Sequence, residues 1–171
     1  MKNRSMQIFV RTFLGLAILV VGTQLVSAQD KEGQERSSLE GVWQVTVTPR
    51  NCVTGAPIPA AVSEALFTFH KGGTMSAWAQ NRVITVTRSP SHGLWQQVRG
   101  WRDHSFKFVH LRYDLATGTF TGRQEGIGSL QLSVFGDDFT TDSQVLIFDV
   151  NGNLTATGCS NAVGTRFAMG Q

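Results

Sequence analysis

The sequence has few of the features that mark metal sites, nucleic-acid binders or helical proteins. Among its 171 residues only Cys52 and Cys159 are cysteines, and no Cys-x-x-Cys or Cys/His cluster is present, which argues against a zinc site. No segment after residue 28 repeats its apolar residues with the 3.6-residue period of an amphipathic helix. No apolar run approaches the roughly 20 residues that a membrane-spanning helix needs. The sequence therefore predicts neither a helical fold nor a metal or other cofactor.

The excess of basic residues belongs to the N-terminus. Three basic residues stand before or at the start of an apolar run that ends near the small-residue sequence Val26-Ser27-Ala28, the layout of a secretory signal peptide. Subtracting these three from the 15 basic residues leaves 12 against 12 acidic ones from Gln29 onward. We therefore expect a signal peptide over 1–28, with an uncleaved anchor as the alternative. The mature protein should be secreted or periplasmic, with no membrane span and no nucleic-acid partner.

The remaining chain predicts one all-β domain. Residues 29–39 are polar and without periodicity, which indicates a flexible leader before a domain over 40–171. Alternating or β-branched segments predict strands at Val42–Thr48, Glu64–His70, Thr74–Gln80, Val83–Thr87, Leu94–Gly100, Phe106–Asp114, Thr119–Ser133, Phe139–Val150 and Leu154–Phe167. A loop is expected at Arg88–Gly93. Short connections favour an antiparallel up-and-down meander, and closing about eight strands into a barrel removes the exposed edges.

The two cysteines support closure. Both lie in the portion expected to be exported, where an oxidising compartment favours a disulfide. Cys52 follows the first expected strand and Cys159 lies in the last, so a bridge would join the two ends of the meander. Two free buried thiols are the alternative.

Gly41-Val42-Trp43, on the first expected strand, resembles the Gly-x-Trp motif with which lipocalins and other calycins begin. In that family an Arg or Lys near the end of the chain packs across the Trp ring at the closed end of the barrel. Arg166 stands at the matching place here. The resemblance covers 41–167 loosely, and the family's Thr-Asp-Tyr motif is missing. It implies a lipocalin-like barrel in which Trp43 is buried beneath Arg166.

Aromatic residues and one mixed strand face predict where a ligand would lie. The expected cup is lined by Phe69, Trp78, Trp95, Trp101, Phe106 and Phe108. It is expected to open beside the Arg88–Trp95 segment. Strict alternation puts on one strand face His104, Phe106, Phe108, His110 and Arg112. From this face His104 joins the expected ligand-binding residues, and Glu125 is the candidate for a lumen carboxylate. The alternatives are a core packed with these rings, a strand face partly open to solvent, and a solvated Glu125 on the outer face.

The leading functional expectation is an exported protein that binds a small hydrophobic molecule in its lumen. The first alternative is a cofactor-free cyclase or isomerase that acts on a flexible hydrophobic substrate by positioning it. The second is a structural or interaction domain with a packed lumen. No residue is assigned a catalytic role, and a homodimer is left open.

Overall fold

The computed structural model describes residues 38–81 and 86–169. Its elements are β1 (Gly41–Arg50), η1 (a 3-10 helix, Pro59–Ala61), β2 (Ser63–Phe69), β3 (Thr74–Asn81), β4 (Val86–Arg88), β5 (Ser91–Arg99), β6 (Asp103–Asp114), β7 (Phe120–Leu132), β8 (Asp138–Phe148) and β9 (Leu154–Arg166). Within these ranges, no helix is long and apolar enough to cross a membrane. The expected signal peptide, and the expected leader up to residue 37, lie outside the described residues.

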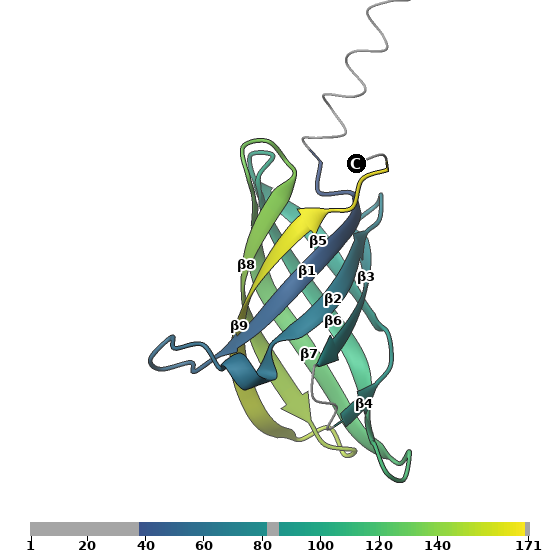
Figure 1. The fold of residues 1–171 in the computed structure, drawn as a ribbon. Helices are drawn as coiled ribbons and strands as arrows, with labels where there is room; N and C mark the ends of the chain where they lie inside the picture. Colours follow the sequence, from purple (N-terminus) through teal and green to yellow (C-terminus); the bar gives the residue numbers. More distant parts are fainter. Residues whose placement is uncertain (1–37, 82–85, 170–171) are drawn as a thin grey trace, which may run out of the picture. The chain divides into compact units, whose positions relative to one another are not determined.

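The strands form a closed antiparallel barrel (Figure 1). Each strand pairs with its neighbour in sequence, except that β3 pairs with β5 across the short β4. Pairing of β9 with β1 completes a ring of eight strands, and β4 pairs with the end of β6. The predicted fold class, an all-β up-and-down barrel of about eight strands, is confirmed.

The loop expected over Arg88–Gly93 is mostly strand, so that expectation was wrong. Only Ser89 and Pro90 separate the end of β4 from the start of β5. Ser89 keeps the chain against β6, because its N–H donates to the carbonyl of Leu111 at 3.0 Å and its Oγ accepts from the N–H of Leu111 at 3.0 Å. Proline has no N–H to donate, which explains why the ladder is interrupted at this point.

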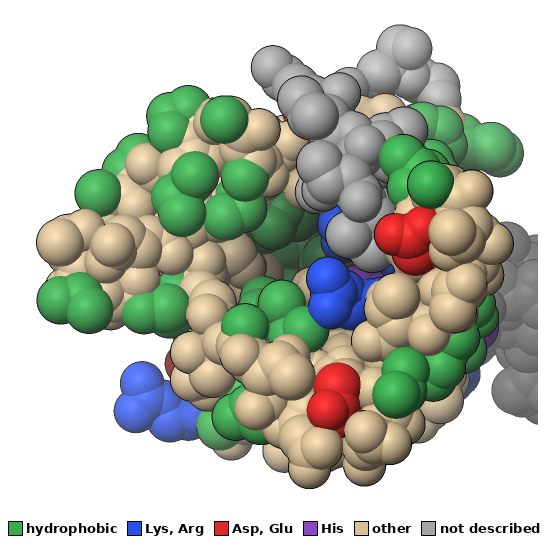
Figure 2. Space-filling model, turned by 90° about the horizontal axis from the view of Figure 1, so that it is seen from below, with side chains coloured by type: hydrophobic (Ala, Val, Ile, Leu, Met, Phe, Trp, Pro, Cys, Tyr) green, Lys and Arg blue, Asp and Glu red, His purple; other side chains and the backbone are tan. Residues whose placement is uncertain are grey.

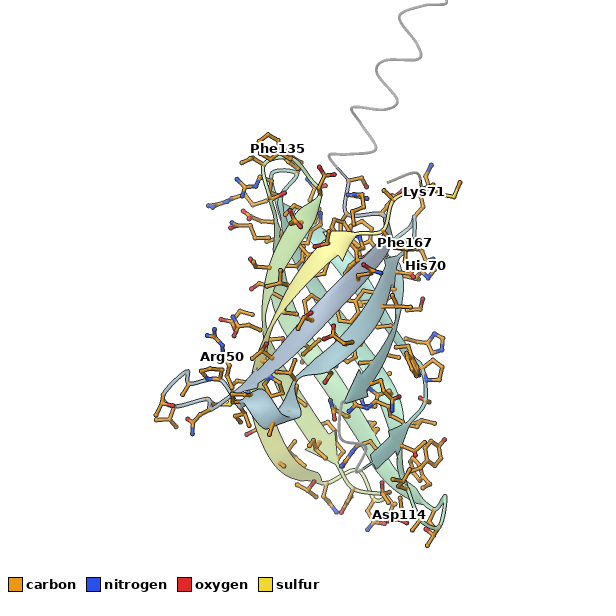
Figure 3. The ribbon with its side chains drawn as sticks, in the orientation of Figure 1. Arg50, His70, Lys71, Asp114, Phe135 and Phe167 are labelled. Atoms are coloured by element: carbon orange, nitrogen blue, oxygen red, sulfur yellow. A yellow bond between two sulfur atoms is a disulfide. The ribbon has the colours of Figure 1, made fainter. Side chains whose placement is uncertain are left out.

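One end of the barrel, here called the Trp43 end, carries the turns that join β2 to β3, β5 to β6 and β7 to β8. Figure 3 labels Lys71 and Phe135 there. Leu39 is 1% exposed, and its carbonyl accepts a hydrogen bond from Nε1 of the fully buried Trp43 at 3.0 Å. The folded domain therefore includes residues 38 and 39, which were expected to belong to the leader.

Arg166 covers the Trp43 ring, as the Gly-x-Trp resemblance predicted. Its guanidinium carbon lies 4.3 Å from the ring centroid. The same group donates to the carbonyls of Ser38 and Glu40 at 2.6 and 2.8 Å, and to that of Gly136 at 2.8 and 3.0 Å. Since an arginine stacked on an indole also directs its donors outward in one plane, a single side chain ties the N-terminal segment, β9 and the β7–β8 turn together.

The predicted disulfide between Cys52 and Cys159 is confirmed, with the two Cα atoms 5.2 Å apart. Cys52 lies in the loop that follows β1, and Cys159 lies in β9. The bridge therefore links the two strands whose pairing closes the barrel. The bridge spans 107 residues in sequence. On the chain-entropy model, a loop of that length contributes about 4–5 kcal/mol to stability.

Candidate ligand site in the barrel lumen

The lumen is filled with rings at the Trp43 end. Ring centroids lie 4.9 Å apart for Trp43 and Phe139, and 6.0 Å apart for Phe69 and Trp95. The Trp95 indole also donates to the carbonyl of His70 at 3.1 Å, which fixes the ring across the β2–β3 turn. Such tilted and edge-on pairs are the packing expected of a protein core. The described rings therefore pack against one another in this half of the lumen.

A cavity of about 70 Å³ lies further along the lumen, toward the opposite end. We call this the Arg88 end; it carries the β6–β7 turn, where Figure 3 labels Asp114. The apolar lining of the cavity consists of Val47, Phe67, Ala77, Ala79, Phe106, Phe108, Val145 and Ala162. Its polar lining consists of Ser63, Arg88, Ser91, His110, Gln124, Thr141, Ser143 and Ser160. The cavity thus has apolar walls and a concentrated set of hydrogen-bonding groups, the mixture typical of small-molecule sites.

Two glycines on β7 shape the aromatic wall. The rings of Phe106 and Phe108 are nearly parallel, at 4°, with centroids 6.1 Å apart. A Cβ atom at Gly126 would overlap the Phe108 ring, and one at Gly128 would overlap the Phe106 ring. Any larger residue at these two positions would push the rings into the cavity. The wall is therefore set by the backbone of β7 as well as by the phenylalanines themselves.

His110 is the most buried polar group of the cavity, with 3% of its surface exposed. Its Nδ1 lies 3.2 Å from the Ser91 Oγ, while its Nε2 has no hydrogen-bond partner among the described residues. Burial, followed by the charges of Arg88 and Arg112, lowers the pKa of His110 to about 4. The nearby Gln124 amide opposes this lowering of the pKa, although no hydrogen bond to Nε2 is formed. The imidazole is therefore neutral at pH 7.

Two arginines face each other beside His110. Arg88 on β4 pairs directly with Arg112 on β6, and Arg112 lies on the same strand face as His110, two residues away. Burial and then the charge of Arg112 lower the pKa of Arg88. Figure 2 views the molecule from this end and shows basic and histidine side chains in the hollow at its centre. None of the described residues that line the cavity is acidic.

The structure divides the expected ligand-binding residues into three groups. Phe106 and Phe108 line the cavity, as expected. Phe69, Trp95 and His104 face the lumen but belong to the packed Trp43 end, where His104 lies 5.6 Å from Trp95 between ring centroids. The cup therefore does not open beside Trp95, because that partly buried ring packs against the core.

Trp78, Trp101 and Glu125 do not face the lumen, which corrects the predicted lining. Trp78 is 49% exposed because its neighbours Ala77 and Ala79 take the inward positions of β3. Trp101 lies in the β5–β6 turn and is 39% exposed. The third expectation, a lumen carboxylate, fails because the neighbours of Glu125, Gln124 and Gly126, take the inward positions of β7.

Glu125 is bound on the outer face of the barrel. Its carboxylate lies 2.9 Å from Lys107 and 3.0 Å from Arg123. Hydrogen bonds from these two residues lower its pKa. A carboxylate held by two cations on the outer wall is a structural feature and contributes nothing to the cavity.

Arg88, Ser91 and Gln124 were not among the expected site residues, although each lines the cavity. For Arg88 and Ser91, the only signal was an unusual Arg-Ser-Pro-Ser segment, whose proline favoured a loop. Alternation put His110 and Arg112 on one strand face; the structure has His110 lining the cavity, whereas Arg112, two residues further along β6, is half-buried and is not part of the cavity lining. No group of three or more His, Cys, Asp or Glu within residues 38–81 and 86–169 is arranged to hold a metal ion.

No family model and no curated protein sequence matches this chain. The function of the lumen site is therefore inferred from the barrel, the aromatic wall and the buried polar groups alone.

Proposed function

We propose that this protein is an exported binding protein that holds a small, largely apolar molecule in its barrel lumen. The observation that carries the proposal is the cavity between the Phe106–Phe108 wall and the buried His110, whose Nε2 has no partner among the described residues. Buried polar atoms in folded proteins almost always have a hydrogen-bond partner. An orphan atom next to a cavity therefore suggests a ligand or an ordered water at that place.

The size of the cavity limits the ligand. At about 70 Å³ it is smaller than the roughly 300–1,000 Å³ pockets that hold drug-sized molecules. It is also smaller than the about 150 Å³ apolar cavity that is known to hold benzene. A ligand that fits without rearrangement has only a few heavy atoms inside the lumen.

Export and a lipocalin-like relationship belong to the same proposal. The disulfide supports an oxidising compartment, since such bridges persist outside the cytosol. The Trp43–Arg166 stack supports a relationship to the calycin barrels, whose closed end carries this pair.

Native mass spectrometry of the exported protein, purified without denaturation, tests the proposal directly. The expected result is a mass excess of one small molecule that is lost on mild activation. A matched pair of variants places the molecule: Thr141→Leu adds a side chain to the cavity, and Thr140→Leu changes the outward-facing neighbour. Displacing the added side chain costs about 1–3 kcal/mol, so Thr141→Leu should weaken retention about tenfold or more. A lumen that retains no molecule in the unaltered protein would contradict the proposal and favour the packed alternative.

A further inference from the structure

The cavity combines a short apolar wall with a concentration of positive charge, which narrows the class of ligand. Arg88 and Arg112 are directly opposite each other on paired strands. Like charges in that arrangement repel and destabilise a sheet. An anion bound between or beside the two guanidinium groups removes the repulsion.

His110 supplies a second donor to the same place. When the Ser91 hydroxyl donates to Nδ1, the proton of the neutral imidazole is carried by Nε2, which is the atom without a partner among the described residues. The charges of Arg88 and Arg112 both act on this imidazole, so the three groups share one region of the lumen. A group that accepts hydrogen bonds from all of them has to be an anion or a strong acceptor.

Two carboxylates of this end, Asp114 and Asp149, accept hydrogen bonds within the turns that carry them. Asp114 accepts hydrogen bonds from Ala116 and Thr117 in the β6–β7 turn, at 2.8–3.1 Å. Asp149 accepts from Asn151 and Asn153 in the β8–β9 turn, at 2.8–3.0 Å. These side chains stabilise their own turns, and neither of them lines the cavity.

We propose that the ligand is a small organic carboxylate, with its head group held by Arg88, Arg112 and His110 and its short apolar tail against Phe106 and Phe108. This inference rests on the proposed function and deepens it. A carboxylate matches the planar fork of an arginine with two parallel hydrogen bonds, and it accepts from an imidazole N–H as well. The cavity volume of about 70 Å³ limits the tail to a few carbons inside the lumen.

The test compares acids with amides of the same shape. Butanoate and hexanoate differ from butanamide and hexanamide in charge while keeping the planar head and the tail. Isothermal titration of the exported protein at pH 7 and low salt should show each acid binding at least about tenfold more tightly than its amide. Arg88→Gln and Arg112→Gln should each reduce acid binding at least about tenfold and reduce amide binding by a smaller factor, because an amide carbonyl accepts from a guanidinium without the charge attraction.

Arg99→Gln is the matched control, since it removes the same charge from a side chain that is 89% exposed in the β5–β6 region. It should leave both affinities unchanged. Circular dichroism and the thermal midpoint check that each variant is folded. If a variant does not fold, its titration is replaced by thermal denaturation of the unaltered protein with the acid or the amide added. The acid should then raise the thermal midpoint more than the amide does.

The outcomes separate this inference from the proposed function. The carboxylate assignment is overturned if acid and amide bind equally well, or if the arginine variants bind the acids normally. Either result still leaves the proposed binding of a small molecule in the lumen standing. A neutral molecule found by native mass spectrometry has the same two consequences. Absence of acid binding at any soluble concentration overturns the inference, while a retained molecule of another class still supports the proposed function.

Discussion

Both ends of the barrel contain an arginine that faces inward, and the two arginines have different surroundings. At the Trp43 end, Arg166 stacks on an indole and donates to three carbonyl groups. At the Arg88 end, the residue directly opposite Arg88 is a second arginine. Rings fill the lumen around Arg166, whereas a cavity adjoins Arg88.

This difference separates stability from recognition within one fold. Satisfied donors, close-packed rings and a buried indole all favour the folded state at the Trp43 end. Opposed charges, a desolvated imidazole and an unfilled volume each cost folding free energy at the Arg88 end. If this division is correct, substitutions at the first end should destabilise the protein, and substitutions at the second should cost little stability or increase it.

The largest expected effect is that of Trp43→Ala. Removing a fully buried indole leaves a cavity in a packed core, so the free energy of unfolding should fall by about 3–5 kcal/mol. Urea denaturation with the disulfide intact measures this. Trp78→Ala is the control, since that ring is 49% exposed on the outer wall, and it should cost much less. Equal losses in the two variants would mean that the Trp43 end is not the stabilising core.

Titration of His110 should give the second-largest effect. Because its pKa is about 4 in the folded protein and near 6.5 in the unfolded chain, the unfolded state binds more protons between these values. Stability is therefore lost as the pH falls from 7 toward 4, by about 2 kcal/mol between pH 7 and pH 5.

His110→Gln should remove that part of the pH dependence, as measured by urea denaturation at pH 7 and pH 5. The exposed His92 offers a control, and His92→Gln should leave the dependence as it is in the unaltered protein. A His110→Gln protein that loses as much stability on acidification as the unaltered one would show that the imidazole is not buried in a positive environment.

A smaller effect is expected for Arg166→Lys, which keeps the charge and loses the planar fork. The lysine cannot reach the carbonyls of Ser38, Glu40 and Gly136 together, so stability should fall by about 1–2 kcal/mol. Arg99→Lys, at an exposed site, should change stability by less than about 0.5 kcal/mol. If Arg166→Lys is as stable as the unaltered protein, the stacked guanidinium is not what holds the N-terminal segment.

The sequence predicted the Trp43 end well because its signals are local. Alternation within Val42–Thr48 puts Trp43 and Val45 on the same strand face, and both are buried. A motif and a late arginine identified the Trp43–Arg166 pair, and two cysteines in an exported chain left few alternatives to a bridge. Each of these inferences needed only neighbouring residues or a single pairing.

The Arg88 end could not be predicted in the same way. That Arg88 faces Arg112 depends on the register between β4 and β6, which is set by the whole barrel. Pro90 favoured a loop because a proline weakens a strand, and Ser89 compensates by bonding to Leu111. For Trp78, both faces of β3 carried apolar residues. The inward positions go to the small residues Ala77 and Ala79, which line the cavity opposite rings from other strands.

The smallest expected effect has the opposite sign and tests the difference between the two ends most directly. Arg112→Gln removes one of two like charges that face each other, so the free energy of unfolding should rise by about 0.2–1 kcal/mol. On the outer wall, Arg123 lies 3.0 Å from Glu125 and stacks over Phe148 at 4.1 Å, so Arg123→Gln should lower stability by up to about 1 kcal/mol. Urea denaturation at low salt resolves the two signs, and added salt should shrink the gain of Arg112→Gln because it screens the repulsion. A loss of stability in Arg112→Gln would mean that Arg112 supports the fold, and the separation of the two ends would then fail.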